Sequence, residues 1–344
     1  MKYFIITFGC QMNVSDSERI ATYLEKEGYK PGSKKEEADL LMVNMCSVRQ
    51  SAVDRVFGVS RNFDALRIKK PKLKTVLTGC ILKSNRKLFK EKFDEILDKK
   101  TFLNLRPKYK DKKLAYIPIS NGCNNFCTYC VVPYTRGPLK CFSHKKILNE
   151  AKSAIRKGCK EIWLLGQNVN DYHSEQITNN RKQVINFSKL LELINKLPGD
   201  FKIRFMSPNP KNFSDELIDA MANCEKVAKF LNLPVQSGDN KILKAMNRPY
   251  TRKQYKKLVQ KIREKIPDIN LTTDVIVGFP GETKRQFENT LKLFKDIKFN
   301  LAYVAKYSPR KGTAAFKLKD NILLEEKKRR EKILKKVIAD NAPK

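Results

Sequence analysis

The sequence predicts an α/β protein in which an N-terminal three-layer domain with a parallel sheet is followed by a partial barrel of six βα units. Two observations lead to this prediction. Apolar strand-like segments alternate with amphipathic helical segments along the 344 residues, and a polar, basic segment at 105–113 separates three of these units from six later ones. The chain is also too long for one ordinary hydrophobic core.

The first block, residues 1–104, contains three strand–helix units. The expected strands span 3–8, 39–45 and 75–79, and the expected helices span 15–29, 49–66 and 85–97. Ser15 or Asp16 is expected to cap the first helix. The order βαβαβα predicts a parallel, Rossmann-like sheet with right-handed crossovers.

The second block, residues 114–322, repeats the pattern on a larger scale. The expected strands span 114–120, 161–167, 202–207, 230–236, 272–278 and 301–307, with helical patterns between them such as 144–158, 214–223 and 283–297. Six units fall short of the eight of a closed TIM barrel, so we expect a (βα)6 barrel that is open on one side. Its chemistry should lie at the C-terminal ends of the strands. A basic helical segment at 323–344 follows.

The charge and the cysteine content limit the possible classes of function. There are 71 Lys and Arg residues against 36 Asp and Glu residues, a net charge of +35, which indicates either a lysine-rich solvated surface or a polyanionic partner such as nucleic acid. No apolar run approaches the ~18 residues of a membrane span, and the N-terminal segment lacks the features of a signal peptide. We therefore expect a cytoplasmic protein without a membrane partner, whose nine cysteines serve metal binding or catalysis rather than disulfides.

Three cysteines, Cys123, Cys127 and Cys130, lie directly after the first expected barrel strand; we call them the loop triplet. Zinc usually takes four protein ligands, or three that include histidine, and neither His144 nor His173 has suitable spacing. Iron–sulfur clusters are held by thiolates, and three thiolates leave one iron of a [4Fe–4S] cluster open. The spacing therefore predicts an iron–sulfur cluster with a free iron, and unrelated buried thiols are the simpler alternative.

Three further cysteines, Cys10, Cys46 and Cys80, each lie just past an expected strand of the first block; we call them the strand-end triplet. Because the ends of parallel strands gather along one edge of a sheet, we expect these thiols to converge. A second three-thiolate cluster with an open iron is the natural hypothesis. The alternative is three separate buried cysteines, which behave as small apolar residues.

The pattern C-x3-C-x-aromatic-C after the first strand of a partial barrel resembles the signature of the radical S-adenosylmethionine (SAM) superfamily. Tyr129 fills the aromatic position and by resemblance would lie against the adenine of SAM; the alternative is a packed core residue. Together with the strand-end triplet, the chain resembles the methylthiotransferases over almost its entire length. The similar segments are "GCQMNVSDSE", "NMCSVRQSA", "GCNNFCTYCVVPYTRG", "LLGQNVNDY", "LPVQSG", "MNRPYTR", "DVIVGFPGET" and "YSPRKGTAA".

The resemblance implies a transferase with two [4Fe–4S] clusters: the strand-end triplet would hold the cluster that provides the sulfur, and the loop triplet would hold the cluster that cleaves SAM to a radical. The segments "CSVR" and "VVPYTRG" are most similar to the tRNA branch, which adds a methylthio group to C2 of N6-isopentenyladenosine-37 beside the anticodon. The alternatives are threonylcarbamoyl-adenosine-37, an aspartate of ribosomal protein S12, or a degenerate, non-catalytic RNA-binding relative. The implied partners are the anticodon stem-loop of tRNA and a flavodoxin- or ferredoxin-like electron donor, and the sulfur source is left open.

The resemblance also implies further contacts to SAM. Gln167 and Asn168, at the end of the second barrel strand, would hold the methionine amino group. Ser207 and Gln236 close the third and fourth strands and would contact hydroxyl or carboxylate groups, and Gly278 would permit a close approach to the adenine. The alternative is that these residues are ordinary strand-end caps and turn residues.

The chain departs from the family pattern at several positions. The family usually has histidine where this chain has Asn209 and Asn232, and a Glu-x-Ser-Arg pattern where it has Leu139, Cys141 and Phe142. Because of these differences, the family's substrate contacts near the clusters do not carry over to these positions. Cys141 could be an inert packed residue or an adventitious ligand. Family members generally continue into a small RNA-binding TRAM domain, whereas here the basic helix at 323–344 follows, so we expect that domain to be absent or truncated.

Overall fold

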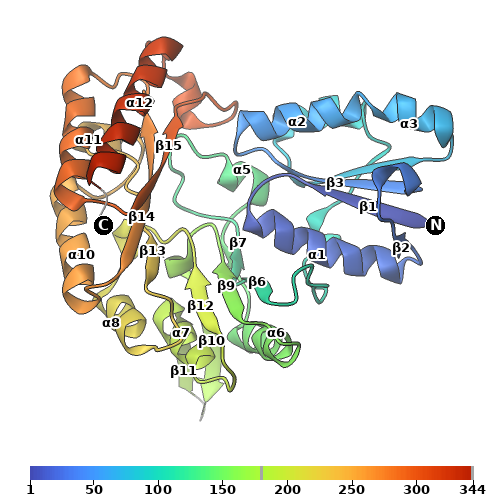
Figure 1. Ribbon diagram of the computed structural model, residues 1–344, viewed down its shortest axis with the longest axis horizontal. Coiled ribbons are helices and arrows are strands. Elements are labelled where there is room, and N and C mark those ends of the chain that lie inside the picture. The colour runs from blue at the N-terminus through green and yellow to red at the C-terminus, as the bar shows by residue number, and fades with distance from the viewer. Residues whose placement is uncertain (179–180, 342–344) are drawn as a thin grey trace.

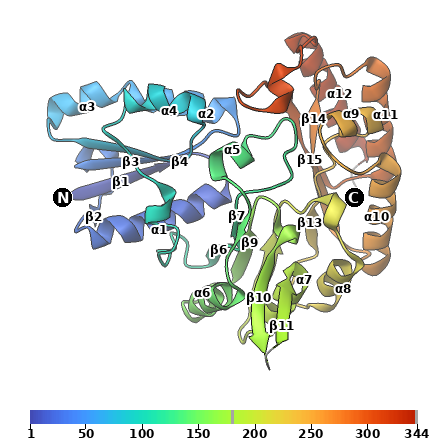
Figure 2. The same ribbon diagram turned by 180° about the vertical axis from the view of Figure 1, so that it is seen from behind.

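The computed structural model describes residues 1–178 and 181–341, and it has the predicted α/β architecture (Figure 1). A parallel sheet with helices on both faces forms the N-terminal part of the molecule, and a partial barrel forms the rest. Figures 1 and 2 show the two parts side by side, with the short helix α5 (Val132–Arg136) between them. Within the described ranges, no helix combines the length and the apolar character needed to cross a bilayer.

The N-terminal sheet has five parallel strands, of which the central three are those that the sequence predicts. Their spatial order is β2 (Lys30–Pro31), β1 (Lys2–Thr7), β3 (Leu40–Cys46), β4 (Lys74–Cys80) and β5 (Glu95–Ile96). Helix α1 covers one face, and three helices cover the other (Figures 1 and 2). These helices are α1 (Gln11–Lys26), α2 (Gln50–Ser60), α3 (Phe63–Lys69) and α4 (Lys83–Lys90).

Strand β3 illustrates why this sheet is buried on both sides. Leu41 and Val43 pack into the apolar cluster under α2, α3 and α4, whereas Leu40 and Met42 pack into the cluster under α1. Because successive side chains of a strand point to opposite faces, a strand that is covered on both sides has to be apolar throughout. This explains the continuous apolar segment at 39–45.

All three helix predictions for the N-terminal part are wrong at their boundaries. The first helix begins at Gln11 with Cys10 at its N-cap, so Ser15 and Asp16 lie inside the helix and are fully buried. They have tertiary partners instead of a capping role: Ser15 Oγ donates to the Tyr116 carbonyl of the barrel at 2.8 Å, and Asp16 pairs with a barrel arginine described below.

The other two expected helices are interrupted. The segment 49–66 forms two helices, α2 and α3, separated at Arg61 and Asn62. The segment 85–97 forms only the short helix α4, because its end pairs with β4 as the edge strand β5. Edge pairing depends on a distant partner strand, so local periodicity did not reveal it.

The barrel has the six predicted parallel strands in two sheets of three. The strands are β6 (Leu114–Pro118), β9 (Glu161–Leu165) and β12 (Lys202–Phe205) in one sheet, and β13 (Phe230–Asn232), β14 (Asn270–Val277) and β15 (Leu301–Lys306) in the other. A parallel bridge between Ile203 and Val227 brings the two sheets together, which gives the open six-stranded barrel. Helices on the outside bury its core; they are α6 (His144–Arg156), α7 (Phe187–Asn195), α8 (Asp215–Asn223), α10 (Arg252–Lys265), α11 (Lys284–Ile297) and α12 (Leu324–Asn341).

Several smaller elements were not predicted. The antiparallel hairpin of β10 (His173–Thr178) and β11 (Arg181–Asn186) projects from the barrel in both ribbon views. The remaining elements are β7 (Ser120–Asn121), β8 (Lys140–Cys141), α9 (Asn240–Ala245) and short 3-10 turns at Lys35–Glu37, Lys99–Thr101, Val169–Asp171, Pro210–Asn212 and Ala314–Lys317. The last residues of the expected C-terminal helix, 342–344, lie outside the described residues.

The segment 105–113 lies along α1 rather than spanning open solvent. The Thr22 hydroxyl donates to the Arg106 carbonyl at 2.7 Å, and the Lys110 amide donates to the Glu18 carboxylate at 3.1 Å. On the same helix, Arg19 forms a buried ion pair of 2.6 Å with Glu150 of α6. The connecting segment and α1 together therefore hold the N-terminal part against the barrel.

Replacing Phe89 by Ala tests the core under α2, α3 and α4. Phe89 is fully buried and stacks on Phe57 at 4.7 Å between ring centroids, so its loss leaves a cavity. We expect Phe89→Ala to reduce the free energy of unfolding by about 3–5 kcal/mol. The adjacent Leu88 is 50% exposed, and Leu88→Ala should change stability by no more than about 0.5 kcal/mol. Equal midpoints for the two variants in urea unfolding followed by circular dichroism would contradict this packing.

Glu18 predicts a pH dependence of stability. Burial raises the pKa of Glu18 from 4.5 to about 7. The unfolded chain releases this proton near its ordinary pKa, so the fold loses stability as the pH rises from about 4.5 through 7. Glu18→Gln removes this loss, and we expect it to stabilise the protein by up to about 2 kcal/mol at pH 8 but not at pH 4.5. Urea unfolding at both pH values measures the difference, with the exposed Glu27→Gln as control; an equal effect of Glu18→Gln at both pH values would refute the assignment.

Candidate functional site

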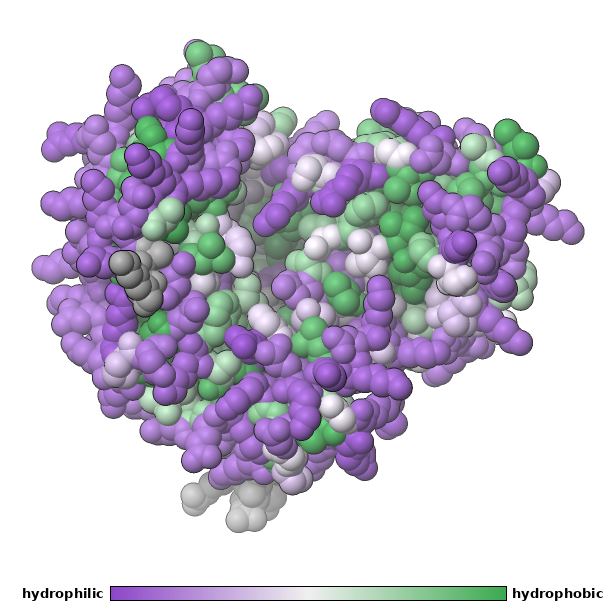
Figure 3. Space-filling view, in the orientation of Figure 1, coloured by the Kyte–Doolittle hydropathy of each residue, from purple (hydrophilic) through white to green (hydrophobic). Residues whose placement is uncertain are grey.

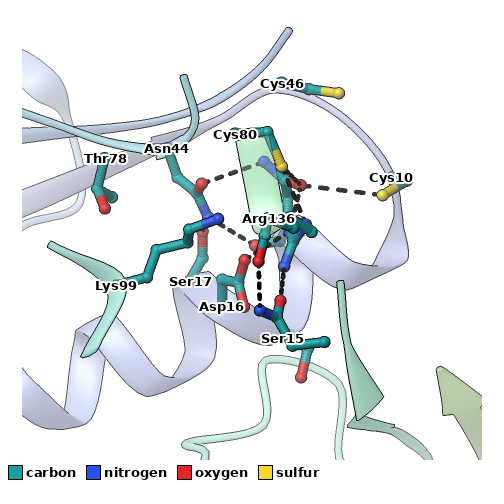
Figure 4. A network of polar contacts seen from close by, with 12 residues as sticks. Cys10, Ser15, Asp16, Ser17, Asn44, Cys46, Thr78, Cys80, Lys99 and Arg136 are labelled. Carbon is teal, nitrogen blue, oxygen red and sulfur yellow. Dashed lines mark hydrogen bonds and ion pairs between the residues drawn. The ribbon is translucent and has the colours of Figure 1, made fainter. Parts of the chain in front are cut away.

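The strand-end triplet converges at the carboxyl edge of the N-terminal sheet (Figure 4). Cys46 and Cys80 are direct neighbours on β3 and β4, and Cys10 follows β1 at the start of α1. Cys46 and Cys80 are buried, while Cys10 is exposed. The parallel order of the strands is the cause, because it places all three strand ends at one edge.

Asn13 links the members of this triplet. Its Oδ1 lies 3.8 Å from the sulfurs of both Cys10 and Cys80, and its Nδ2 donates to the Met45 carbonyl at 2.8 Å. Position 9, near Asn13, requires glycine. Gly9 has a φ of +132°, and a Cβ on this residue would lie 2.7 Å from the Cβ of Cys46. The backbone is therefore packed tightly around the three thiols.

The two buried thiols of the triplet have opposite pKa shifts. A hydrogen bond from Cys46, together with the positive charge of Arg136, lowers the pKa of Cys80 to about 5 despite its burial. The same hydrogen bond, together with burial, raises the pKa of Cys46. The negative charge of the pair is therefore favoured on Cys80, and the thiolate is the form of cysteine that binds a metal.

The loop triplet lies between β7 and α5, and each of its sulfurs accepts a hydrogen bond. The donors are Asn125 Nδ2 to Cys123 at 3.3 Å, Arg248 Nη1 to Cys127 at 3.5 Å, and the Val132 amide to Cys130 at 3.4 Å. Burial raises the pKa of Cys130 to about 12 and also raises that of Cys123. A metal would therefore have to displace protons from these thiols when it binds.

The donor sets of both triplets fit thiolate-held iron–sulfur clusters. In the part of the chain that the structure describes, no three His, Cys, Asp or Glu side chains gather around one point as they would for a single metal ion. A [4Fe–4S] cluster places each thiolate on a different iron, so its ligands are spread more widely than those of one ion. N–H groups that point at the sulfurs are the outer contacts that such clusters use.

Tyr129, between the second and third cysteines of the loop triplet, packs on a small apolar cluster. Its neighbours include Met246 and Phe279, and burial raises the pKa of its hydroxyl. The neighbouring backbone is strained, because Phe126 has φ +46°, and Asn247 Nδ2 holds that conformation by donating to the Phe126 carbonyl at 3.1 Å. Whether Tyr129 also lies against an adenine stays a prediction.

Gln167 and Asn168 lie beside the loop triplet, at the end of β9. Gln167 Oε1 accepts a 2.6 Å hydrogen bond from the Gly122 amide, directly before Cys123. Asn168 is buried; its Oδ1 accepts from the Asn209 amide at 3.1 Å, and its Nδ2 has no hydrogen-bond partner among the described residues. A buried unpaired donor at this position would suit a carboxylate or carbonyl ligand, because leaving it unpaired is costly.

The other predicted SAM residues have unusual backbone conformations. Ser207 and Gln236, just beyond β12 and β13, have φ values of +63° and +68°. Non-glycine residues in this region are strained, and such strain concentrates at functional sites. At Gly278 a Cβ would collide with the Lys327 side chain of α12, so packing against that helix accounts for this glycine without an adenine.

The two asparagines that replace the family's histidines form local hydrogen bonds. Asn232 Nδ2 donates to the Asp274 carboxylate at 2.8 Å, and Asn209 Oδ1 accepts from the Lys211 amide at 3.2 Å. Cys141 lies on β8, 3.9 Å from His173 Nδ1.

The other two departing positions lie on either side of Cys141. The Leu139 amide donates to Asn124 at 3.0 Å, and Phe142 packs on the barrel core with the Lys146 ammonium 4.3 Å from its ring centre. The altered positions are therefore compatible with an intact barrel.

Four residues of the site escaped the sequence analysis: Asn13, Asn125, Arg136 and Arg248. Asn13, Asn125 and Arg136 lie close to cysteines in the sequence, in the segments "GCQMN", "NGCNN" and "YTRG", and Arg248 lies in "MNRPYTR". Only proximity to the cysteines could have suggested the first three. Their partners are set by the fold: Arg248 contacts a cysteine that is 121 positions away in the sequence.

Comparisons with known proteins agree with this geometry. The model of the Radical SAM superfamily matches residues 117–294, and that of the Uncharacterized protein family UPF0004 matches residues 2–98. Among solved structures, the radical S-adenosylmethionine methyltransferase TsrM from Kitasatospora setae is 13% identical, with a TM-score of 0.62 over 89% of this chain and 74% of that chain. The cobalamin-dependent radical enzyme OxsB is also 13% identical, with a TM-score of 0.60 over 98% of this chain and 55% of that chain. These likenesses support the fold alone.

Curated relatives are much more similar. A tRNA-2-methylthio-N(6)-dimethylallyladenosine synthase of Thermoanaerobacter sp. (strain X514) is 42% identical over 353 residues, which cover 93% of this chain and 74% of the relative. The enzyme of the same name from Clostridium novyi (strain NT) is 40% identical over 354 residues, covering 93% and 77%. The chain therefore belongs to the radical SAM superfamily and, within it, to the family of the tRNA-2-methylthio-N(6)-dimethylallyladenosine synthases.

Proposed function

We propose that this protein is a tRNA methylthiotransferase that adds a methylthio group to C2 of N6-isopentenyladenosine at position 37, with SAM and two [4Fe–4S] clusters as cofactors. The observation that supports this most is the 42% identity over 93% of the chain to a synthase with that named product. The presence of two cysteine triplets, one in each part of the molecule, agrees with it. The names of the relatives favour this substrate over threonylcarbamoyl-adenosine and over ribosomal protein S12.

The reaction explains why two cysteine sites are needed. The C2–H bond of the adenine ring is strong and its proton is not acidic, so ordinary acid–base chemistry does not activate it. The bound clusters with SAM supply the radical chemistry that the reaction requires. The strand-end triplet holds one cluster and the loop triplet holds the other. Asn125, Arg248 and the Val132 amide stabilise the loop thiolates, and Gln167 fixes the backbone before the first of them.

Around the SAM site the chain supplies polar strand ends and one aromatic ring. Tyr129 would border the adenine of bound SAM, Asn168 would offer its unpaired amide to the methionine end, and the strained residues Ser207 and Gln236 would present polar groups beyond β12 and β13. Gly278 lies at the end of β14 on the same rim of the barrel. All five lie at the C-terminal ends of barrel strands or in the loops beyond them, where such barrels bind their ligands.

The domains and partners follow from the same assignment. Residues 1–104 form the domain of the strand-end triplet, 105–113 the connection, 114–322 the radical SAM barrel, and 323–344 a basic C-terminal segment that contains α12 (Leu324–Asn341). The net charge of +35 suits the anticodon stem-loop of tRNA, because neutralising phosphates supplies much of RNA affinity. A flavodoxin- or ferredoxin-like protein supplies electrons, and the protein works in the cytoplasm, where its tRNA substrate is found.

The space-filling view shows a hollow that could admit the anticodon loop. The face in Figure 3 is hollowed between the barrel and the N-terminal sheet; its floor is apolar or weakly polar, and its rims are hydrophilic. A base that is modified at an edge has to leave the stack, and apolar surfaces suit an unstacked base while charged rims suit phosphates. This hollow is the proposed entry for the nucleotide.

The iron content tests the cluster assignment. Anaerobically reconstituted protein should hold about eight irons per chain, and the triple variant Cys10→Ala/Cys46→Ala/Cys80→Ala and the triple variant Cys123→Ala/Cys127→Ala/Cys130→Ala should each hold about four. Cys159→Ala is the matched control, because this cysteine is buried in the barrel core and its thiol donates to the Glu161 carbonyl at 3.1 Å. Zinc in place of iron, or full iron in either triple variant, would overturn the assignment.

Mass spectrometry of nucleosides tests the reaction. The reconstituted protein, with SAM, a low-potential reductant and sulfide, should convert N6-isopentenyladenosine-37 in tRNA to its 2-methylthio derivative. Transcripts that lack the isopentenyl group and the loop-triplet triple variant should give no product. Methylthiolation of threonylcarbamoyl-adenosine or of S12, with no product from isopentenyladenosine, would replace this function with one of the sister activities.

A further inference from the structure

Arg136 reaches from the loop of one cysteine triplet to a thiol of the other. It ends α5, which begins two residues after Cys130, and its side chain is 2% exposed. Its Nε donates to the sulfur of Cys80 at 3.0 Å (Figure 4). The main chain of this residue thus belongs to one candidate cluster site and its guanidinium to the other.

The remaining donors of Arg136 are also engaged. Nη2 donates to Asp16 Oδ2 at 2.8 Å and to Asn13 Oδ1 at 3.1 Å, and Nη1 donates to Asn121 Oδ1 at 3.0 Å. Asn121 returns a 3.1 Å hydrogen bond from its Nδ2 to the Arg136 carbonyl. A planar guanidinium held on all sides in this way has a single orientation.

We infer that Arg136 is a positioning residue that fixes the strand-end triplet against the loop triplet and, through its hydrogen bond to Cys80, raises the reduction potential of the cluster held by the strand-end triplet. This inference rests on the proposed assignment of that triplet to an iron–sulfur cluster. It adds a role for a residue that lies outside both sets of cysteine ligands.

The effect on the potential follows from charge. Reduction adds one negative charge to a cluster, and a buried positive charge with an N–H directed at a coordinating sulfur stabilises the reduced form. Lys99 is a second cation in the same region, and its Nζ donates to the Thr135 carbonyl, directly before Arg136, at 3.1 Å. Asp16 balances part of this charge, so the arginine acts mainly through its direct contact with Cys80.

The positioning effect follows from Asn13. Arg136 fixes the same Asn13 oxygen that lies 3.8 Å from the sulfurs of Cys10 and Cys80. A shift of the guanidinium would therefore disturb two of the three thiols at once. Residues that orient metal ligands without binding the metal typically change affinity or activity by about 10–100-fold when they are replaced.

The ion pair between Arg19 and Glu150 provides a matched control. It too is buried and joins the N-terminal part to the barrel, with an N–O distance of 2.6 Å, but within the described ranges Arg19 donates to Ser15 and Glu150 and to no cysteine. If Arg136 only held the two parts together, its loss and the loss of Arg19 would have similar effects on the clusters.

The test is a redox titration of the strand-end cluster alone, monitored by electron paramagnetic resonance. It uses the variant Cys123→Ala/Cys127→Ala/Cys130→Ala, which lacks the other cluster. Arg136→Met should shift the midpoint potential to a more negative value, Arg136→Lys should shift it less because the charge is kept, and Arg19→Met should leave it unchanged. In the enzyme with all six cysteines, Arg136→Met should lower kcat for methylthiolation by about 10–100-fold with little change in KM for tRNA.

Two further variants separate the possible failures. Arg136→Met leaves Asp16 buried without a partner, so Asp16→Asn/Arg136→Met removes both charges and should fold even if the single variant does not. If the potential of either variant equals that of Arg19→Met, this inference is wrong. If Cys10→Ala/Cys46→Ala/Cys80→Ala retains all its iron, the cluster assignment itself is wrong.

Discussion

The N-terminal sheet and the barrel sheet that contains β6 direct their carboxyl ends toward one interface, and the buried guanidinium of Arg136 spans it. Parallel order is what makes such an arrangement possible, because every strand then delivers its following loop to the same edge. The strand-end triplet gathers at one edge, and the loop triplet follows the first barrel strand at the other. The contacts between the two triplets depend on these two sheet edges facing each other.

The interface is polar rather than apolar, which has an energetic consequence. Asn13, Asp16, Arg19 and Arg136 are buried there, and removing a charge from water costs several kcal/mol unless it is paired. Each of these charges has a partner, as in the Arg136–Asp16 and Arg19–Glu150 pairs. Such pairs add little net stability compared with apolar packing, but they form only when the N-terminal part and the barrel have one particular relative position. An interface of this kind suits two metal sites that must cooperate.

The far side of the barrel makes a second connection. Arg310, beyond β15, donates to the Ser47 carbonyl, which directly follows Cys46, and to the Gln50 side chain. The strand-end triplet is thus approached by one barrel arginine near Cys80 and by another near Cys46. Since α5 follows the first barrel strand and Arg310 follows the last, both ends of the open barrel contact the region of the strand-end triplet.

The sequence by itself determined the alternation of strands and helices, the two parallel regions, and the positions of three cysteines at strand ends and three in the loop after the first barrel strand, because these follow from local periodicity and spacing. It also led to the correct family. Only the tertiary structure decided that Ser15 and Asp16 are interior residues of α1, that Arg136 binds Cys80, and that Gly278 packs on Lys327. Each of these depends on a partner far away in the chain, and local patterns hold no information about which distant side chain will fill a contact.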